Sequence, residues 1–77
     1  MIRVKEVETL SNFMLELLFT NGEKKIFDMN PYLEKGIFKN LKDVSIFNSA
    51  FVSFGTVEWK NGIDICPDLL YENSYIK

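Results

Sequence analysis

The sequence contains no histidine and only one cysteine, Cys66, among its 77 residues. One cysteine cannot form an intramolecular disulfide, and without histidine it cannot complete a structural zinc site. Neither a histidine nor a second cysteine is present to activate the Cys66 thiol for nucleophilic catalysis. We therefore expect no enzymatic activity, no cofactor and no metal ligands, and we expect a reducing compartment.

Long apolar runs and an excess of positive charge are also lacking. The first eight residues, Met-Ile-Arg-Val-Lys-Glu-Val-Glu, carry charges where a secretory signal needs an apolar run, and no apolar stretch is long enough to span a membrane. The sequence therefore predicts a cytoplasmic protein without a membrane span. Nine basic against eleven acidic residues give a net charge of -2, the opposite of what a protein that binds nucleic-acid phosphates by itself usually carries.

The two prolines and four glycines are dispersed, and no linker or internal repeat interrupts the chain. We predict one small α+β domain over residues 1–77, with an antiparallel sheet of hairpins and two or three short helices. A chain of this length buries only roughly 60% of its unfolded surface. Its core is therefore marginal, and a homo-oligomer or a partner complex is an expected way to add stability.

The first half of the chain predicts a three-stranded antiparallel meander. Phe13, Leu15, Leu17 and Phe19 recur at every second position, with Glu16 and Thr20 on the other face, as in a half-buried strand. Asn21-Gly22 is the strongest short signal for a hairpin before residues 23 to 29. A two-residue turn would place Phe19 opposite Lys24, Leu17 opposite Ile26 and Leu15 opposite Asp28. Residues 3 to 10 have apolar side chains every third position, which a strand with a bulge would direct inward at Val4 and Val7.

Three short helices are expected from their end signals. Asn30-Pro31 is typical of an N-cap followed by the first helical residue, and Gly36 is suited to a left-handed C-terminal position, so we predict one turn over residues 31–35. Asp43 is expected to cap a helix over residues 44–50. Pro67 begins the last helix, and we expect the tail 73–77 to be frayed.

A second hairpin is predicted over residues 56–60 and 63–66, joined by Asn61-Gly62. The same two-residue turn would place Trp59 opposite Asp64, where the carboxylate could accept the indole N–H as a clamp across the hairpin. The alternative is that Trp59 is the centre of a binding surface, because tryptophan is a frequent interface anchor.

A dense signature in this region matches a known family. It consists of Trp59-x-Asn61-Gly62-x-Asp64-Ile65-x-Pro67-x-x-Leu70-Tyr71. Upstream, the matching positions are Val4, Val7, Leu10, Leu15, Asn21, Gly22, Asp28, Pro31, Leu33, Gly36, Phe38, Leu41, Asp43 and Phe47. With these residues the chain resembles the small bacterial proteins catalogued as domain of unknown function 2442.

The resemblance implies a compact α+β fold and no established activity. Members of that family have been proposed as antitoxin-like partners of a small toxin encoded beside them, and some carry a C-terminal helix-turn-helix domain. This chain ends a few residues after Tyr71, so we do not expect that domain or its DNA binding here.

Two functions remain as hypotheses. The first is a protein–protein interaction module, the antitoxin-like partner of a small protein, that binds by pairing an edge strand or by docking through exposed side chains. The five candidate residues for docking are Trp59, Asn61, Asp64, Tyr71 and Tyr75. The second is a nucleic-acid-binding accessory that uses the lysine patch Lys35, Lys39 and Lys42. A small-ligand or ion-binding domain is a third, weaker alternative, because Asp64, Asp68 and Glu72 do not fall on one face of a single element.

Overall fold

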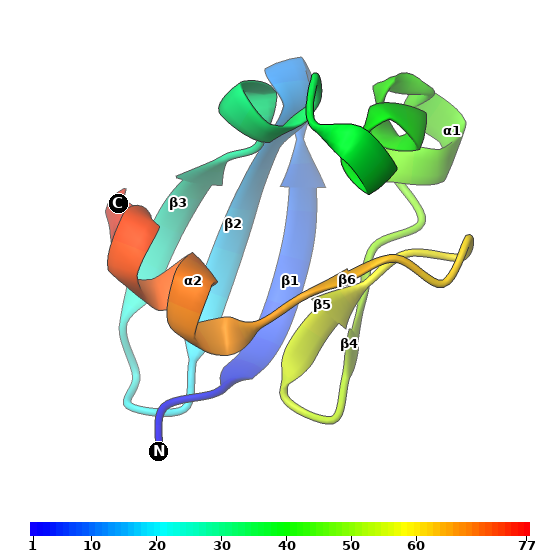
Figure 1. The fold of residues 1–77 in the computed structure, drawn as a ribbon. Helices are drawn as coiled ribbons and strands as arrows, with labels where there is room; N and C mark the ends of the chain where they lie inside the picture. Colours follow the sequence, from blue (N-terminus) through cyan, green and yellow to red (C-terminus); the bar gives the residue numbers. More distant parts are fainter.

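The computed structural model describes all residues 1–77 and contains two antiparallel sheets with short helices packed on one side of the first (Figure 1). The first sheet has the strand order β1-β2-β3-β7, made of β1 (Val4–Leu10), β2 (Met14–Phe19), β3 (Lys24–Asp28) and β7 (Tyr75–Ile76). The second has the order β4-β5-β6, made of β4 (Phe51–Ser53), β5 (Thr56–Glu58) and β6 (Asp64–Ile65). The expected α+β class is confirmed.

The meander β1-β2-β3 and the bulge in β1 are confirmed. The register shifts between Val4 and Glu6, so that Val4 pairs with Phe19 and Val7 pairs with Leu17. Both valines thus lie on the same face as the buried side chains of β2. Without the extra residue, one of them would lie on the opposite face, because side chains alternate along a strand.

The predicted register of the first hairpin is wrong by one residue. The closing pair is Phe19 with Glu23, whose carbonyl accepts the Phe19 N–H at 2.9 Å, so the loop has three residues and not two. Three-residue loops with glycine in the left-handed region are the next most common hairpin connection, and Gly22 has φ +90°. The shift places Phe27 on the buried face and turns Ile26 to the outer face opposite Glu16.

The second hairpin has the same one-residue error. Trp59 N–H donates to the Ile63 carbonyl at 2.9 Å, and Glu58, not Trp59, pairs with Asp64. The strand β4 was not predicted at all. It pairs with β5 through a two-residue turn, Phe54-Gly55, in which both residues have positive φ.

The helical segments follow the predicted end signals only in part. Asn30 lies inside a helical segment and is not its N-cap, since Met29 precedes it and the Asn30 N–H donates to the Asp28 carboxylate at 2.9 Å. Gly36 has the expected positive φ of 42° but begins a further helical segment. Two 3-10 helices, η2 (Asn30–Tyr32) and η3 (Gly36–Lys42), replace the predicted helical turn at 31–35, and a third, η1 (Ser11–Phe13), joins β1 to β2. The carboxylate of Asp43 accepts the Ser45 N–H and caps α1 (Val44–Phe47), which ends before the predicted Ala50. The last helix, α2 (Pro67–Asn73), begins at Pro67 as expected.

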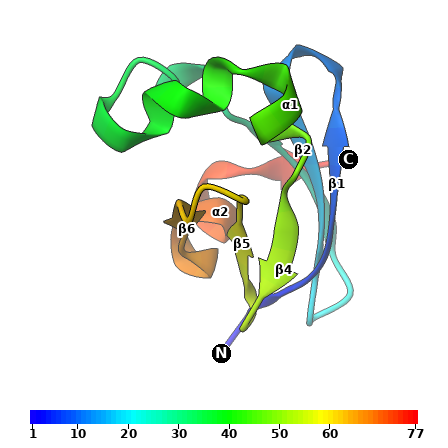
Figure 2. The same ribbon diagram turned by 90° about the vertical axis from the view of Figure 1, so that its right-hand side faces the viewer.

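The core lies between the first sheet and the elements that cover one of its faces. Figure 2 shows that sheet nearly edge-on, with α2 and the second sheet all on one side. The largest fully buried side chains are Trp59, Phe19, Phe27, Phe47, Leu15, Leu17, Met29, Leu41, Leu70 and Val57. The opposite face of the sheet is left without a covering element. No helix of the protein is both long and apolar enough to cross a membrane.

The tail is ordered as a strand, which corrects the expectation that residues 73–77 fray. Tyr75 pairs with Ile26 and Ile76 pairs with Lys25, which adds β7 to the open edge of β3. Beyond the strand, the Lys77 ammonium reaches the Glu16 carboxylate on the outer face. The sequence of the tail has no strong strand pattern, so only the available edge of β3 accounts for its order.

Candidate partner-binding surface

Trp59 is a core residue and not part of a surface. It has no exposed area, and its indole N–H donates to the carbonyl of Phe47 at 2.9 Å. The expected clamp with Asp64 is therefore wrong, because the one-residue change in register turns the two side chains to opposite faces. The alternative, in which a partner contacts the Trp59 ring, is also contradicted by its complete burial.

Asn61 and Asp64 are exposed on the second hairpin, but their side chains have different contacts. The Asn61 side-chain oxygen accepts the Ile63 N–H at 3.2 Å, which is the local turn contact expected of asparagine. Asp64 faces Glu58 across the β5–β6 ladder. Two carboxylates in that position repel one another, so a cationic group from outside the protein would be favoured there.

Tyr71 anchors α2 to the first sheet. Its ring packs edge-on against Phe19 with centroids 5.0 Å apart, and the Lys25 ammonium lies 3.7 Å from the centroid of the Tyr71 ring. The hydroxyl donates to the Glu23 carboxylate, which lowers the pKa of Glu23 and raises the pKa of Tyr71. The Asn21 amide also donates to Glu23, at 2.6 Å. These contacts occupy the polar end of Tyr71, so its position is explained by packing.

Tyr75 is exposed on β7. It lies in a cross-strand row with Ile26, Glu16 and Glu8 on the uncovered face of the first sheet. The Lys77 ammonium bonds to Glu16 and lowers the pKa of its carboxyl. Figure 1 places the C-terminus and the β5–β6 turn at opposite ends of the molecule. The five predicted partner-binding residues therefore do not form one surface.

The lysine patch is exposed but partly neutralised. Lys42 forms an ion pair with Glu34, whose pKa is lowered mainly by that contact. The Lys35 ammonium lies 5.6 Å from the ring centroid of Tyr32, within the range of a cation–π contact. Lys39 forms no ion pair. The three lysines thus offer less free charge to a phosphate backbone than their spacing indicates.

No group of three or more acidic or cysteine side chains in the protein could together hold a metal ion. Asp64 lies in β6, whereas Asp68 and Glu72 lie in α2. Cys66 is exposed and precedes α2 without a side-chain capping bond.

The most exposed large apolar side chain within an ordered element or turn is one that the sequence analysis missed. Phe54 is 96% exposed at the tip of the β4–β5 hairpin, and its φ of 51° lies in the left-handed region. The Arg3 guanidinium donates to the Phe54 carbonyl at 3.2 Å, and the Val4 N–H donates to the carbonyl of Gly55 at 2.9 Å. Both bonds tie the turn to the start of β1. A glycine directly after Phe54, between two short β-branched segments, was the signal available in the sequence.

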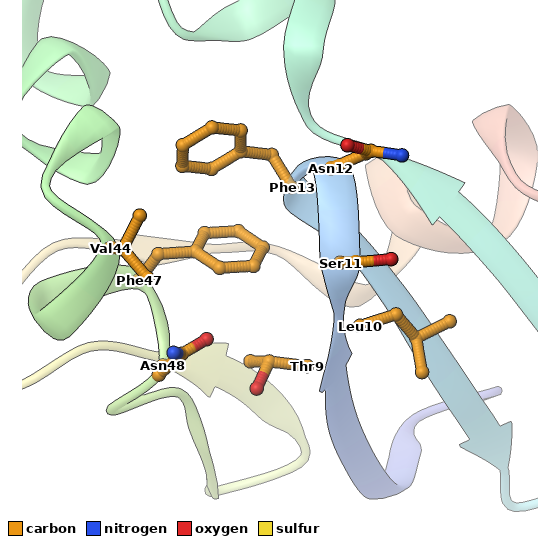
Figure 3. A pocket seen from close by; sticks show the side chains of 8 residues that line it. All are labelled: Thr9, Leu10, Ser11, Asn12, Phe13, Val44, Phe47 and Asn48. Carbon is orange, nitrogen blue, oxygen red and sulfur yellow. The ribbon is translucent and has the colours of Figure 1, made fainter.

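A cavity of about 290 Å³ lies between the end of β1 and α1 (Figure 3). It is lined by Thr9, Leu10, Ser11, Asn12, Phe13, Val44, Phe47 and Asn48, and none of these residues is charged. Figure 3 shows the Phe13, Phe47 and Val44 side chains around the gap, whereas Leu10, Ser11 and Asn12 direct their side chains away and contribute backbone. The rings of Phe13 and Phe47 meet edge-on, 5.2 Å apart. Asn12 and Phe13 are both in the left-handed region, which is a costly conformation for residues other than glycine.

A family model described as "Protein of unknown function (DUF2442)" matches residues 4–75. No curated protein and no solved structure gave a match. The matched segment includes every strand of the first sheet except the last residue of β7, and it includes the entire second sheet.

Proposed function

The chain belongs to the DUF2442 family, and we propose that it is a protein–protein interaction module that acts as the antitoxin-like partner of another small protein. The observation that carries the interaction role is Phe54. Its ring is 96% exposed, although the hairpin on which it lies is tied to β1 by two hydrogen bonds. The antitoxin-like part rests on the family resemblance alone.

Phe54 is in a position where stability alone favours another residue. Two-residue turns with positive φ at both positions strongly prefer asparagine or aspartate before the glycine. A phenylalanine there costs on the order of 1–3 kcal/mol of backbone strain and exposes a large apolar surface to water. Rigid, exposed aromatic side chains are typical of interface anchors. A binding role for Phe54 accounts for both costs.

The interaction role is tested by native mass spectrometry of the tagged protein recovered from its own host, for the unchanged chain and for Phe54→Asn. We expect a stoichiometric small protein with the unchanged chain and a loss of at least about 2 kcal/mol in its affinity, roughly thirtyfold, in the variant. Recovery of the unchanged chain alone, or only as a homo-oligomer, would contradict the proposal. Equal recovery with Phe54→Asn would remove Phe54 from the interface.

The antitoxin-like role has a separate test. The recovered partner is expressed alone and together with the chain, and growth is measured. We expect growth arrest by the partner alone and restored growth on co-expression. Normal growth with the partner alone would contradict the antitoxin-like role and leave the interaction role standing.

The alternative function, a nucleic-acid-binding accessory, uses Lys35, Lys39 and Lys42. It is less favoured, because Lys42 is paired with Glu34 and the whole chain is acidic. Its discriminating property is salt dependence, since counterion release makes such binding weaken steeply between low and physiological ionic strength. Co-purified RNA or DNA with that salt response would favour this alternative over the interaction module.

A further inference from the structure

We infer that the upper part of the free edge of β1 binds an extended segment of a protein partner as an added strand, with basic side chains facing Glu6 and Glu8 and an apolar side chain in the cavity beside α1. This inference rests on the proposed interaction role and names a surface and a partner chemistry for it. It is independent of Phe54, whose carbonyl accepts a hydrogen bond from Arg3, next to the first residue of β1.

The alternation of hydrogen bonds shows which backbone groups of β1 are free. Thr20, just after β2, donates its N–H to the carbonyl of Arg3 at 2.8 Å, so the even-numbered residues of β2 direct their backbone toward β1. Their partners in β1 are also even-numbered beyond the bulge, such as Glu8. Because successive residues of an antiparallel strand direct N–H and C=O to opposite sides, Val7 and Thr9 direct theirs away from β2.

The lower part of this edge is covered, because β4 packs beside β1, whereas the upper part borders the cavity. The Val4 N–H donates to Gly55, and this is the one backbone hydrogen bond between β1 and the second sheet. Higher up, Thr9 and Leu10 line the cavity, which opens on the side of β1 away from β2 (Figure 3). A strand that pairs with Val7 and Thr9 would therefore extend into the space between β1 and α1.

The cavity suits one apolar side chain of such a strand. Its volume of about 290 Å³ is just below the usual range for small-molecule sites, roughly 300–1,000 Å³. The aromatic rings of Phe13 and Phe47 form its wall, and no charged residue lines it. Thr9 lies on the inner face of the sheet, so a residue placed opposite Thr9 would also direct its side chain inward, toward these rings.

The charges on β1 indicate which side chains the added strand should carry beside its apolar residue. Glu6 and Glu8 are exposed on the outer face, and Lys5 at the bulge is the only cation of the strand. Glu8 faces Glu16 across the ladder, Lys77 bonds to Glu16, and Lys24 lies near the same carboxylates, so three carboxylates on this face share two ammonium groups. A lysine or arginine opposite Glu8 on the free side would relieve this repulsion, since opposite charges stabilise cross-strand pairs. The expected segment is therefore basic, any residue, basic, apolar.

The test is an NMR titration of the full chain with two synthetic peptides, Lys-Thr-Lys-Leu and Leu-Lys-Thr-Lys, which present the pattern in the two strand directions. Peptides with glutamate in place of both lysines are the controls. We expect one lysine peptide to bind at least roughly tenfold more tightly than its glutamate control. On binding, the amides of Val7 and Thr9 are expected to gain protection from hydrogen exchange, whereas Glu8, already in the ladder, does not change.

Three variants test whether the peptides bind at the proposed edge of β1. Glu8→Lys is expected to reverse the preference to the glutamate peptide. Thr9→Pro removes the N–H that points away from β2. Proline is tolerated at such an edge position because no hydrogen bond within the sheet is lost, so the variant is expected to fold and to lose peptide binding. Glu72→Lys makes the same charge change on α2 and is expected to bind as the unchanged chain does.

The outcomes separate this inference from the proposed function. Equal binding of lysine and glutamate peptides, no binding of either lysine peptide, or unchanged binding in folded Glu8→Lys would overturn the edge site. If a cellular partner is still recovered by both the unchanged chain and Glu8→Lys, the interaction module stands with a different surface. If no partner is recovered by the unchanged chain, the proposed function itself fails.

Discussion

The indole N–H of Trp59 donates to the carbonyl of Phe47, 2.9 Å away and twelve residues earlier in the chain. This bond joins the second sheet to the end of α1, and the two rings pack with centroids 6.3 Å apart. The only tryptophan of the chain therefore has its polar atom satisfied inside the core. Its role in this structure is to hold two elements together.

Replacing Trp59 with phenylalanine is expected to lower the free energy of unfolding by about 2 kcal/mol. The change leaves the Phe47 carbonyl without its donor and removes part of a buried ring. Urea denaturation followed by circular dichroism measures the loss, since the variant has no tryptophan fluorescence. A loss below about 0.5 kcal/mol would show that the bond contributes little.

Replacing Phe54 with asparagine is expected to raise the free energy of unfolding by about 1 kcal/mol. Asparagine tolerates positive φ better than phenylalanine, and the ring of Phe54 is almost fully exposed, so little packing is lost. The urea midpoint should increase with no change in the slope of the transition. A decrease in stability would mean that the ring contributes to the fold, and it would weaken the case for a binding role.

Replacing Gly55 with alanine is expected to be more destabilising than the same change at Gly22. Both glycines have positive φ, which costs about 1 kcal/mol for alanine. At Gly55 the new methyl group would also lie 2.9 Å from the Arg3 Cβ, whereas at Gly22 it meets nothing within 4 Å. We expect a further loss of about 1 kcal/mol at Gly55 in parallel urea titrations. Equal losses would show that the Arg3 side chain moves away from the turn without cost.

The Tyr71–Glu23 hydrogen bond is expected to make the free energy of unfolding depend on pH in the acid range. It lowers the pKa of the Glu23 carboxyl in the folded protein, so the folded state binds this proton less tightly than the unfolded chain. The stabilisation is therefore present above the ordinary pKa of glutamate and is lost as the pH falls through the lowered value.

Tyr71→Phe provides the measurement, because it removes the hydroxyl and keeps the ring that packs on Phe19. The stability difference between the unchanged chain and Tyr71→Phe should be largest near neutral pH and should narrow under acid conditions. Asn21 still donates to Glu23 in the variant, so some acid dependence is expected to persist. A difference that does not vary with pH would contradict the assignment.

The sequence by itself determined the features that depend on neighbouring residues. Asp43 caps α1 because its carboxylate reaches an N–H two residues ahead, and Pro67 begins α2 because its fixed φ and missing N–H suit a first helical position. The bulge of β1 was also predictable, since only an extra residue places Val4 and Val7 on one face.

Only the tertiary structure decided the registers and the surface. An Asn-Gly pair is compatible with loops of two or three residues, and burial of Phe27 on the inner face is satisfied by the three-residue loop. β4 has three residues, too few for a periodic pattern, so the position of Phe54 depended on pairing with β5. The tail became β7 because β3 had a free edge, and Trp59 found Phe47 through packing of separate elements. These are contacts between segments distant in sequence, which local residue patterns do not encode.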